Sequence, residues 1–219
     1  MHSHQGALGE TLLVYGEAIK HIFDQDWPRR FLVVGLGMGY IELAIVCYWI
    51  QFGGPAPQIE SFESDLELKE GFQNRILGKG ESQSDDFKKA HDLILEGFSK
   101  EFGSPKNLIL EKAKDLLNQG HLVLRGPLDV AEISSPSFSA LLFDAFSRNT
   151  TPELWSEEFL EKFLEKSAAP KSVFATYSAI GNLKRVLKKK KFERQERSGF
   201  GQKRERTLAV RNYLEPKPI

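Results

Sequence analysis

The chain has 219 residues, of which 41% are apolar and 27% charged, and its 30 Lys and Arg balance its 30 Asp and Glu. This composition is typical of a globular protein with a hydrophobic core, and the length predicts one domain. The single cysteine, Cys47, excludes an internal disulfide framework and favours a reducing, cytoplasmic location. The five histidines are scattered without cysteines or carboxylates at ligand spacing, so we expect no metal site.

The first third of the chain predicts a helix followed by a βαβ unit. Residues 5–23 carry apolar side chains at helical spacing. A buried strand at 31–35, a helix at about 40–51 and a second strand at 58–63 follow. This order implies parallel strands joined by a right-handed crossover.

The apolar stretch 31–52 raises the question of a membrane span, because it contains a single charge, Glu42. A carboxylate at mid-depth of a bilayer costs about 2.5–3.5 kcal/mol on insertion scales. Three glycines at alternate positions also interrupt the helical period directly after the strand. A strand, a turn and a buried helix therefore explain these residues better than a spanning helix, and we expect no contact with a membrane.

The rest of the chain predicts an α/β fold. Residues 66–120 are mostly polar and helix-like, which favours a helical insertion within a single domain that spans 1–219. The elements that follow are strands at 121–125, 139–144 and 172–177, helices at 152–167 and 179–190, and closing strands at 192–198 and 206–213. Strands that alternate with helices and end in a hairpin predict a doubly wound, mostly parallel seven-stranded sheet with one reversed strand.

A glycine-rich turn joins the first strand to its helix. Gly35, Gly37 and Gly39 would let the backbone approach a ligand at the helix amino terminus, although a tight turn without a ligand explains them about as well. Glu63, at the end of the second strand, stands where the ribose of a nucleotide would lie. Dinucleotide enzymes use Gly-x-Gly-x-x-Gly, and here position 40 is Tyr, so S-adenosylmethionine fits better than NAD.

Asp144 ends the apolar strand at 139–144. The carboxyl ends of strands form the ligand crevice in doubly wound sheets, so this carboxylate is placed to orient an amine and to accept its proton. A loop carboxylate or helix cap is the alternative. Phe146 and Trp155 could stack on a nucleobase, but core packing is the safer interpretation for Trp155.

A basic run closes the chain. Residues 184–206 contain eleven Lys or Arg and three Glu, so the remainder of this neutral chain carries an excess of eight negative charges. Charge runs are usually solvated surfaces, and we interpret Lys188–Lys191 in this way. The Gly-Phe-Gly turn within the run favours a phosphate-contacting face, in which Phe200 stacks on a base and Lys203 and Arg204 meet phosphates.

With these residues in place, the chain resembles the MnmC-type methyltransferases, which complete the methylaminomethyl group on wobble 2-thiouridine of certain tRNAs. The resemblance covers most of the chain apart from residues 70–120, and the Gly-Phe-Gly-x-Lys-Arg-Glu segment is its most specific part. The matching segments are residues 2–3, 6–8, 10, 14–15, 35–39, 63, 142–146, 152–155, 174–179 and 199–205.

The resemblance implies a Rossmann-like class I methyltransferase that uses S-adenosyl-L-methionine to methylate 5-aminomethyl-2-thiouridine in tRNA. Asp144 would orient the amine and help to remove its proton. The remaining implied contacts are Gly35, Gly37 and Gly39 with the methionine end of the cofactor, Glu63 with its ribose, and Phe146, Phe200, Lys203 and Arg204 with tRNA. The family often has Gly-Asp after the third strand, for the adenine side of the cofactor; this chain has Gly126-Pro127, with Asp129 as a stand-in.

Bifunctional members continue into a flavin-dependent oxidoreductase domain, and this chain stops without one, so we expect no oxidase activity here. Three alternatives stay open. The chain could methylate another amine, on RNA or on a small molecule. It could be a non-catalytic RNA-binding module on the same fold. It could also be a nicotinamide-dependent oxidoreductase, which the spacing of the glycine turn disfavours.

Overall fold

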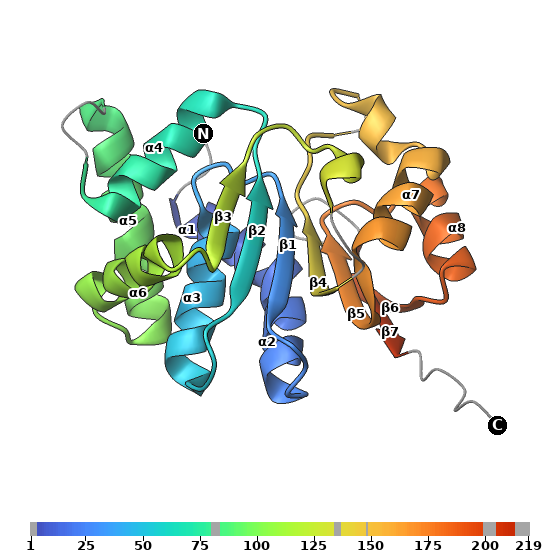
Figure 1. Cartoon of the computed structure of the whole chain (residues 1–219), viewed down its shortest axis with the longest axis horizontal. Coiled ribbons are helices and arrows are strands. Elements are labelled where there is room, and N and C mark those ends of the chain that lie inside the picture. The colour runs from blue at the N-terminus through green and yellow to red at the C-terminus, as the bar shows by residue number, and fades with distance from the viewer. Residues whose placement is uncertain (1–3, 80–83, 134–136, 148, 199–204, 213–219) are drawn as a thin grey trace.

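The computed structural model describes residues 4–79, 84–133, 137–147, 149–198 and 205–212. Its centre is a seven-stranded sheet with the order β3-β2-β1-β4-β5-β7-β6 (Figure 1). The strands are β1 Arg30–Val34, β2 Gln58–Phe62, β3 Leu122–Arg125, β4 Phe138–Phe143, β5 Ala168–Thr176, β6 Glu193–Ser198 and β7 Glu205–Asn212.

The sheet is mostly parallel, with β7 as the reversed strand. β1 runs parallel to β2 and β4, and the pairs β2–β3 and β4–β5 are parallel too, whereas β7 is antiparallel to both β5 and β6. The expected seven-stranded sheet with one reversed strand is therefore confirmed. The strand order reverses between β1 and β4, and open α/β sheets bind ligands at such a switch point.

Helices cover both faces of the sheet. One face packs against α1 His4–Thr11, the π-helix Leu12–Gly16, α2 Glu17–Asp24, α3 Tyr40–Phe52, α4 Leu66–Leu77, α5 Asp85–Phe102 and α6 Lys106–Asn118, and the other against α7 Glu157–Ser167 and α8 Gly181–Lys189. Alternate residues of β1 point to opposite faces of the sheet. Phe31 and Val33 pack in the hydrophobic core between the sheet and α1–α6, and Leu32 packs in the core between the sheet and α7 and α8. Figure 1 shows α4–α6 beside β3 and α7 with α8 on the opposite flank.

The polar stretch 66–120 folds into the helices α4, α5 and α6, so its helical character is as expected. Asp65 caps α4, because its Oδ1 accepts hydrogen bonds from the backbone N–H groups of Glu67 and Leu68 at 2.9 and 3.2 Å. Ser84 caps α5 in the same way, through the N–H of Phe87. The cap on α4 fixes where this helix begins, directly after the end of β2.

The amino-terminal segment departs from the single helix expected over 5–23. Residues Leu12–Gly16 form a π-helix between α1 and α2. This wider turn changes which side chains face the sheet, and it buries Val14 and Tyr15 together. Apolar periodicity alone gives no signal for such a change of helix type.

β1 and α3 account for the apolar stretch 31–52, as expected from its glycines. Within the described residues, no helix is both long and apolar enough to cross a membrane. Glu42 lies on α3 with 1% of its surface exposed, and its Oε1 accepts a hydrogen bond of 2.6 Å from the hydroxyl of Ser61 on β2.

His91 on α5 is fully buried between the rings of Phe72 and Phe87. In the part of the chain that the structure describes, neither ring nitrogen has a hydrogen-bond partner. The pKa of His91 is lowered from 6.5 to about 4, chiefly by burial and in smaller part by the charge of Arg75, while the charge of Asp92 opposes the shift.

We expect His91 to make the protein less stable in acid. Because its pKa is lower in the folded than in the unfolded state, protonation favours unfolding as the pH falls from 6.5 towards about 4. A pKa shift of this size corresponds to a loss of about 3 kcal/mol in the free energy of unfolding. Replacing His91 with Leu should remove this loss, which chemical denaturation at pH 7 and pH 4.5 measures for both proteins. Both proteins retain the buried carboxyl group of Glu42, which therefore contributes equally to the two measurements. Equal losses of stability in the two proteins would contradict the assignment of the effect to His91.

Candidate active site

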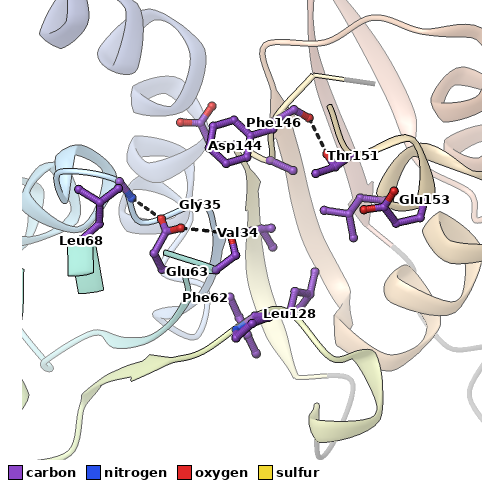
Figure 2. A pocket seen from close by; sticks show the side chains of 15 residues that line it. Val34, Gly35, Phe62, Glu63, Leu68, Leu128, Asp144, Phe146, Thr151 and Glu153 are labelled. Carbon is purple, nitrogen blue, oxygen red and sulfur yellow. Dashed lines mark hydrogen bonds between the residues drawn. The ribbon is translucent and has the colours of Figure 1, made fainter. Parts of the chain in front are cut away.

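A cavity of about 500 Å³ opens at the carboxyl edge of the sheet. Val34, Phe62 and Phe143, the last residues of β1, β2 and β4, lie level with one another in the sheet. The residues that follow them are Gly35, Glu63 and Asp144, and all three line the cavity (Figure 2). The volume is in the range of small-molecule sites.

The three glycines of the turn have different surroundings. Gly35 has a φ of +90°, and a Cβ there would lie 2.5 Å from the backbone oxygen of Asp144. Gly37 has a φ of +52° and faces open space, with no atom within 4 Å of a Cβ position. Gly39 does not line the cavity; a Cβ on it would overlap the ring of Phe72 on α4. Gly35 and Gly37 thus shape the cavity, and Gly39 allows α3 and α4 to pack.

Glu63 connects the end of β2 to the glycine turn. Its Oε2 accepts a hydrogen bond of 2.8 Å from the N–H of Gly37, and its Oε1 accepts one of 2.9 Å from the N–H of Asp65. Only 6% of its surface is exposed, and that surface faces the cavity (Figure 2). The carboxylate is therefore held in a fixed position at the cavity wall.

Asp144 is an exposed carboxylate at the end of β4. Its N–H donates a hydrogen bond of 2.8 Å to the carbonyl of Val34, which continues the β1–β4 ladder. Its Oδ1 accepts a hydrogen bond of 2.6 Å from the hydroxyl of Tyr15 in the π-helix. The sequence placed Tyr15 on an apolar helical stripe and, with Val14, among the segments that resemble the MnmC family, but the spacing of residues gives no signal for its contact with Asp144.

Three side chains hold the loop after β4. The hydroxyl of Tyr177 donates to the carbonyl of Ala145 at 2.8 Å. The Nε1 of Trp155 and the hydroxyl of Thr151 donate to the carbonyl of Phe146, at 2.7 and 3.1 Å. Trp155 is 1% exposed, which agrees with core packing, whereas Phe146 is 60% exposed beside the cavity (Figure 2).

A second buried carboxyl group, Glu42, lies near the site without lining it. Its pKa is raised to about 8, chiefly by burial; the hydrogen bond from Ser61 opposes the shift, and the charges of Asp144 and Glu63 add to it. Its Oε2 has no hydrogen-bond partner within the described residues. Glu42 is consequently protonated at neutral pH.

Asp129 is not among the residues that line the cavity. Asp129 caps the short 3-10 helix Val130–Glu132 through the N–H of Ala131, and Pro127 and Leu128 line the cavity in its place. Phe200, Lys203 and Arg204 lie outside the described residues.

Part of the basic run is neutralised by carboxylates. Arg185, Lys189 and Lys190 form ion pairs with α7, to Glu157, Glu161 and Glu165 respectively. Arg197 and Arg206 both bind Glu17 on α2, at 2.7 and 3.0 Å. Hydrogen bonds from these two guanidinium groups lower the pKa of Glu17, so the carboxylate stays ionised.

Among the described residues, no group of three or more His, Cys, Asp or Glu side chains is arranged to hold a metal ion. The cavity is lined by the glycine turn, by the carboxylates of Glu63, Asp144 and Glu153, and by the loop after β4.

Comparisons with known proteins point to one class of enzyme. Residues 122–212 match the family described as S-adenosyl-L-methionine-dependent methyltransferase. The tRNA 5-methylaminomethyl-2-thiouridine biosynthesis bifunctional protein MnmC of Hahella chejuensis is 38% identical over 86 residues, which cover 38% of this chain and 14% of that protein. Its counterpart from Paraburkholderia xenovorans is 32% identical over 112 residues, which cover 46% and 17%. The matched segments are thus less than a fifth of these relatives.

The same fold occurs in a solved structure, MnmC2 from Aquifex aeolicus. It aligns with 98% of this chain and 63% of its own length, with a TM-score of 0.59 and 18% sequence identity. This likeness supports the fold, and the sequence matches support the family. Over these segments the chain is similar to S-adenosyl-L-methionine-dependent methyltransferases and, among them, to the MnmC proteins.

Proposed function

We propose that this protein transfers a methyl group from S-adenosyl-L-methionine to the exocyclic amine of 5-aminomethyl-2-thiouridine at the wobble position of tRNA. The observation that carries the proposal is the position of Asp144, a carboxylate fixed by Tyr15 at a cavity that the glycine turn also lines. The identity of the substrate nucleoside is inferred from the names of the relatives, which refer to 5-methylaminomethyl-2-thiouridine biosynthesis.

The residues at the cavity fit the cofactor. Bound there, S-adenosyl-L-methionine supplies an electrophilic methyl group, and its departure leaves a neutral thioether. Glu63 would accept hydrogen bonds from the ribose hydroxyls, while Leu68 and Leu128 offer apolar surface to the adenine. Gly35 and Gly37 would let the backbone approach the methionine end, because neither presents a side chain to the cavity.

Asp144 provides the polar contact that an amine needs. Its carboxylate would accept a hydrogen bond from an N–H of the substrate, which aims the nitrogen lone pair at the methyl group. When the new N–C bond has formed, the nitrogen must lose a proton, and Asp144 or water accepts it. Most of the acceleration comes from holding the two reactants in line, because the displacement itself needs little acid–base assistance.

The tRNA would meet the same edge of the sheet. Phe146 is exposed beside the cavity and is available to stack on the base. Ser198 and Glu205, which flank residues 199–204, pair with each other, and Thr207 pairs with Thr176 at the carboxyl end of β5. The further contacts with tRNA in this proposal are those of Phe200, Lys203 and Arg204, which lie outside the described residues.

Two further features belong to the proposal. We treat residues 1–219 as one methyltransferase domain in which 66–120 is a helical insertion. We also place the protein in the cytoplasm, where its substrate tRNA is found.

Transfer of a labelled methyl group from S-adenosyl-L-methionine to total tRNA tests the proposal against its rivals. We expect label in tRNA from cells that lack this methylation and little label in tRNA that already carries the methylaminomethyl group. Cofactor binding without transfer to any RNA would favour the non-catalytic RNA-binding module. Label in small amines alone would assign a different substrate.

A further inference from the structure

The hydroxyl of Tyr15 reaches the predicted catalytic carboxylate from a distant part of the sequence. It donates to Oδ1 of Asp144 at 2.6 Å, and its oxygen also lies 3.4 Å from the carbonyl of Phe143. A length of 2.6 Å is typical of a hydroxyl that donates to an ionised carboxylate. The contact links the π-helix to the end of β4.

We propose that Tyr15 is a positioning residue for methyl transfer: its hydroxyl fixes the rotation of the Asp144 carboxylate and keeps that carboxylate ionised when the substrate amine binds. The inference rests on the proposed role of Asp144. It assigns a function to the π-helix, a type of turn that is often found at functional sites.

Tyr15 is held rigidly enough to do this. It is 3% exposed, and the carbonyl of Val14 beside it accepts a hydrogen bond of 3.4 Å from buried Arg206. Two residues further along, Glu17 binds both Arg197 and Arg206. The segment that carries the phenol is thus tied to the closing hairpin β6–β7, and the hydroxyl cannot follow the carboxylate if the carboxylate rotates.

The phenol remains a neutral donor over the working pH range. Burial raises its pKa well above 10, and the charge of Asp144 raises it further. A backbone hydrogen bond from Tyr177 to the phenol acts in the opposite direction and is the weakest influence. With that backbone group as its donor, the phenol directs its own proton to Asp144. A hydrogen bond to the charged form of a carboxylic acid favours ionisation.

Among the described residues, the charge of Asp144 raises the pKa of Tyr15, Tyr177 and Glu42, and Glu63 lines the same cavity. Tyr177 gives a matched control. Its hydroxyl donates to the carbonyl of Ala145, so Tyr177→Phe removes a hydrogen bond to the loop after β4 but leaves the contact between Tyr15 and Asp144 intact. Glu42 is present in both variants and affects them equally.

The test compares Tyr15→Phe and Tyr177→Phe with the wild-type protein in methyl transfer to tRNA. For Tyr15→Phe we expect kcat to fall about tenfold, the scale of one hydrogen bond to a charged group, with KM and cofactor affinity within about twofold. The acid limb of its pH–rate profile should move up by about 0.5–1 pH unit. Tyr177→Phe should leave that limb in place. An unmoved limb in Tyr15→Phe, or equal movement in both variants, would overturn the proposal.

A titration that needs neither cofactor nor tRNA separates this inference from the proposed function. The carboxyl resonance of Asp144 in ¹³C-aspartate-labelled protein, assigned by its loss in Asp144→Asn, should have a higher pH midpoint in Tyr15→Phe than in Tyr177→Phe. This result would support the Tyr15 contact even if tRNA were not methylated. Equal midpoints would contradict it even if tRNA were methylated.

A third measurement covers the case in which Tyr15→Phe does not fold. In the wild-type protein, a hydroxyl proton held between Tyr15 and Asp144 should give a slowly exchanging ¹H resonance far downfield, with nuclear Overhauser contacts to the Tyr15 ring. Asp144→Asn should move it upfield. Absence of this resonance at low temperature would contradict the contact.

Discussion

Replacing Asp144 with Ala should reduce methyl transfer by about a thousandfold while cofactor affinity changes by less than about threefold. The reason is that the carboxylate faces the substrate, whereas the backbone of Asp144 keeps its place: its N–H bonds to Val34 and its carbonyl packs on Gly35. Single-turnover transfer to tRNA and calorimetric titration with S-adenosyl-L-methionine measure the two quantities separately.

Two variants control for indirect effects of Asp144→Ala. Asp144→Asn keeps an acceptor for the Tyr15 hydroxyl and should be slow in transfer but more stable than Asp144→Ala, by about 1–3 kcal/mol, because no buried donor loses its partner. Glu158→Ala removes an exposed carboxylate on α7 and should transfer at the wild-type rate. Near-normal transfer by Asp144→Ala would show that another group orients the amine.

Replacing Gly35 with Ala should abolish cofactor binding and destabilise the fold. Its φ of +90° is strained for any residue with a Cβ, and the new methyl group would meet the backbone oxygen of Asp144 at 2.5 Å. That oxygen cannot move without breaking the register of β4 with β1. We expect loss of measurable affinity for S-adenosyl-L-methionine, together with a lower thermal midpoint.

Gly78→Ala is the matched control for Gly35→Ala. Gly78 ends α4 with a φ of +73° and has no atom within 4 Å of a Cβ position. Gly78→Ala should therefore lower the free energy of unfolding only by the cost of the strained backbone conformation, about 1 kcal/mol, and leave cofactor affinity normal. If Gly35→Ala lost no more stability than Gly78→Ala and still bound the cofactor, the close packing between the glycine turn and Asp144 would not matter for the site.

Much of the fold can be predicted from this sequence because its strands are strongly apolar and its turns contain glycine and proline. Residues 31–35, 58–63 and 139–144 lie within one residue of β1, β2 and β4 at both ends. Their register brings Gly35, Glu63 and Asp144 to one edge, which is the general rule for parallel strands. The positions of these three residues at a common cavity therefore agree with the sequence-based expectation.

What the sequence could not predict depends on contacts between distant residues. Tyr15 and Asp144 are 129 positions apart, and the hydrogen bond between them depends on the π-helix, whose extra width no apolar period indicates. Gly39 occurs in the same motif as Gly35 and Gly37, yet it packs against Phe72 because α4 crosses there. Asp129 is an acidic residue near the expected position, but the local turn uses it as a cap.

Nucleoside mass spectrometry is the most direct test of the central claim. The protein is incubated with S-adenosyl-L-methionine and tRNA that carries 5-aminomethyl-2-thiouridine, and the digested nucleosides are then separated and weighed. We predict conversion to 5-methylaminomethyl-2-thiouridine, a gain of one methylene unit on that nucleoside, and no conversion with Asp144→Ala. An unchanged nucleoside in the presence of a protein that demonstrably binds the cofactor would contradict the claim.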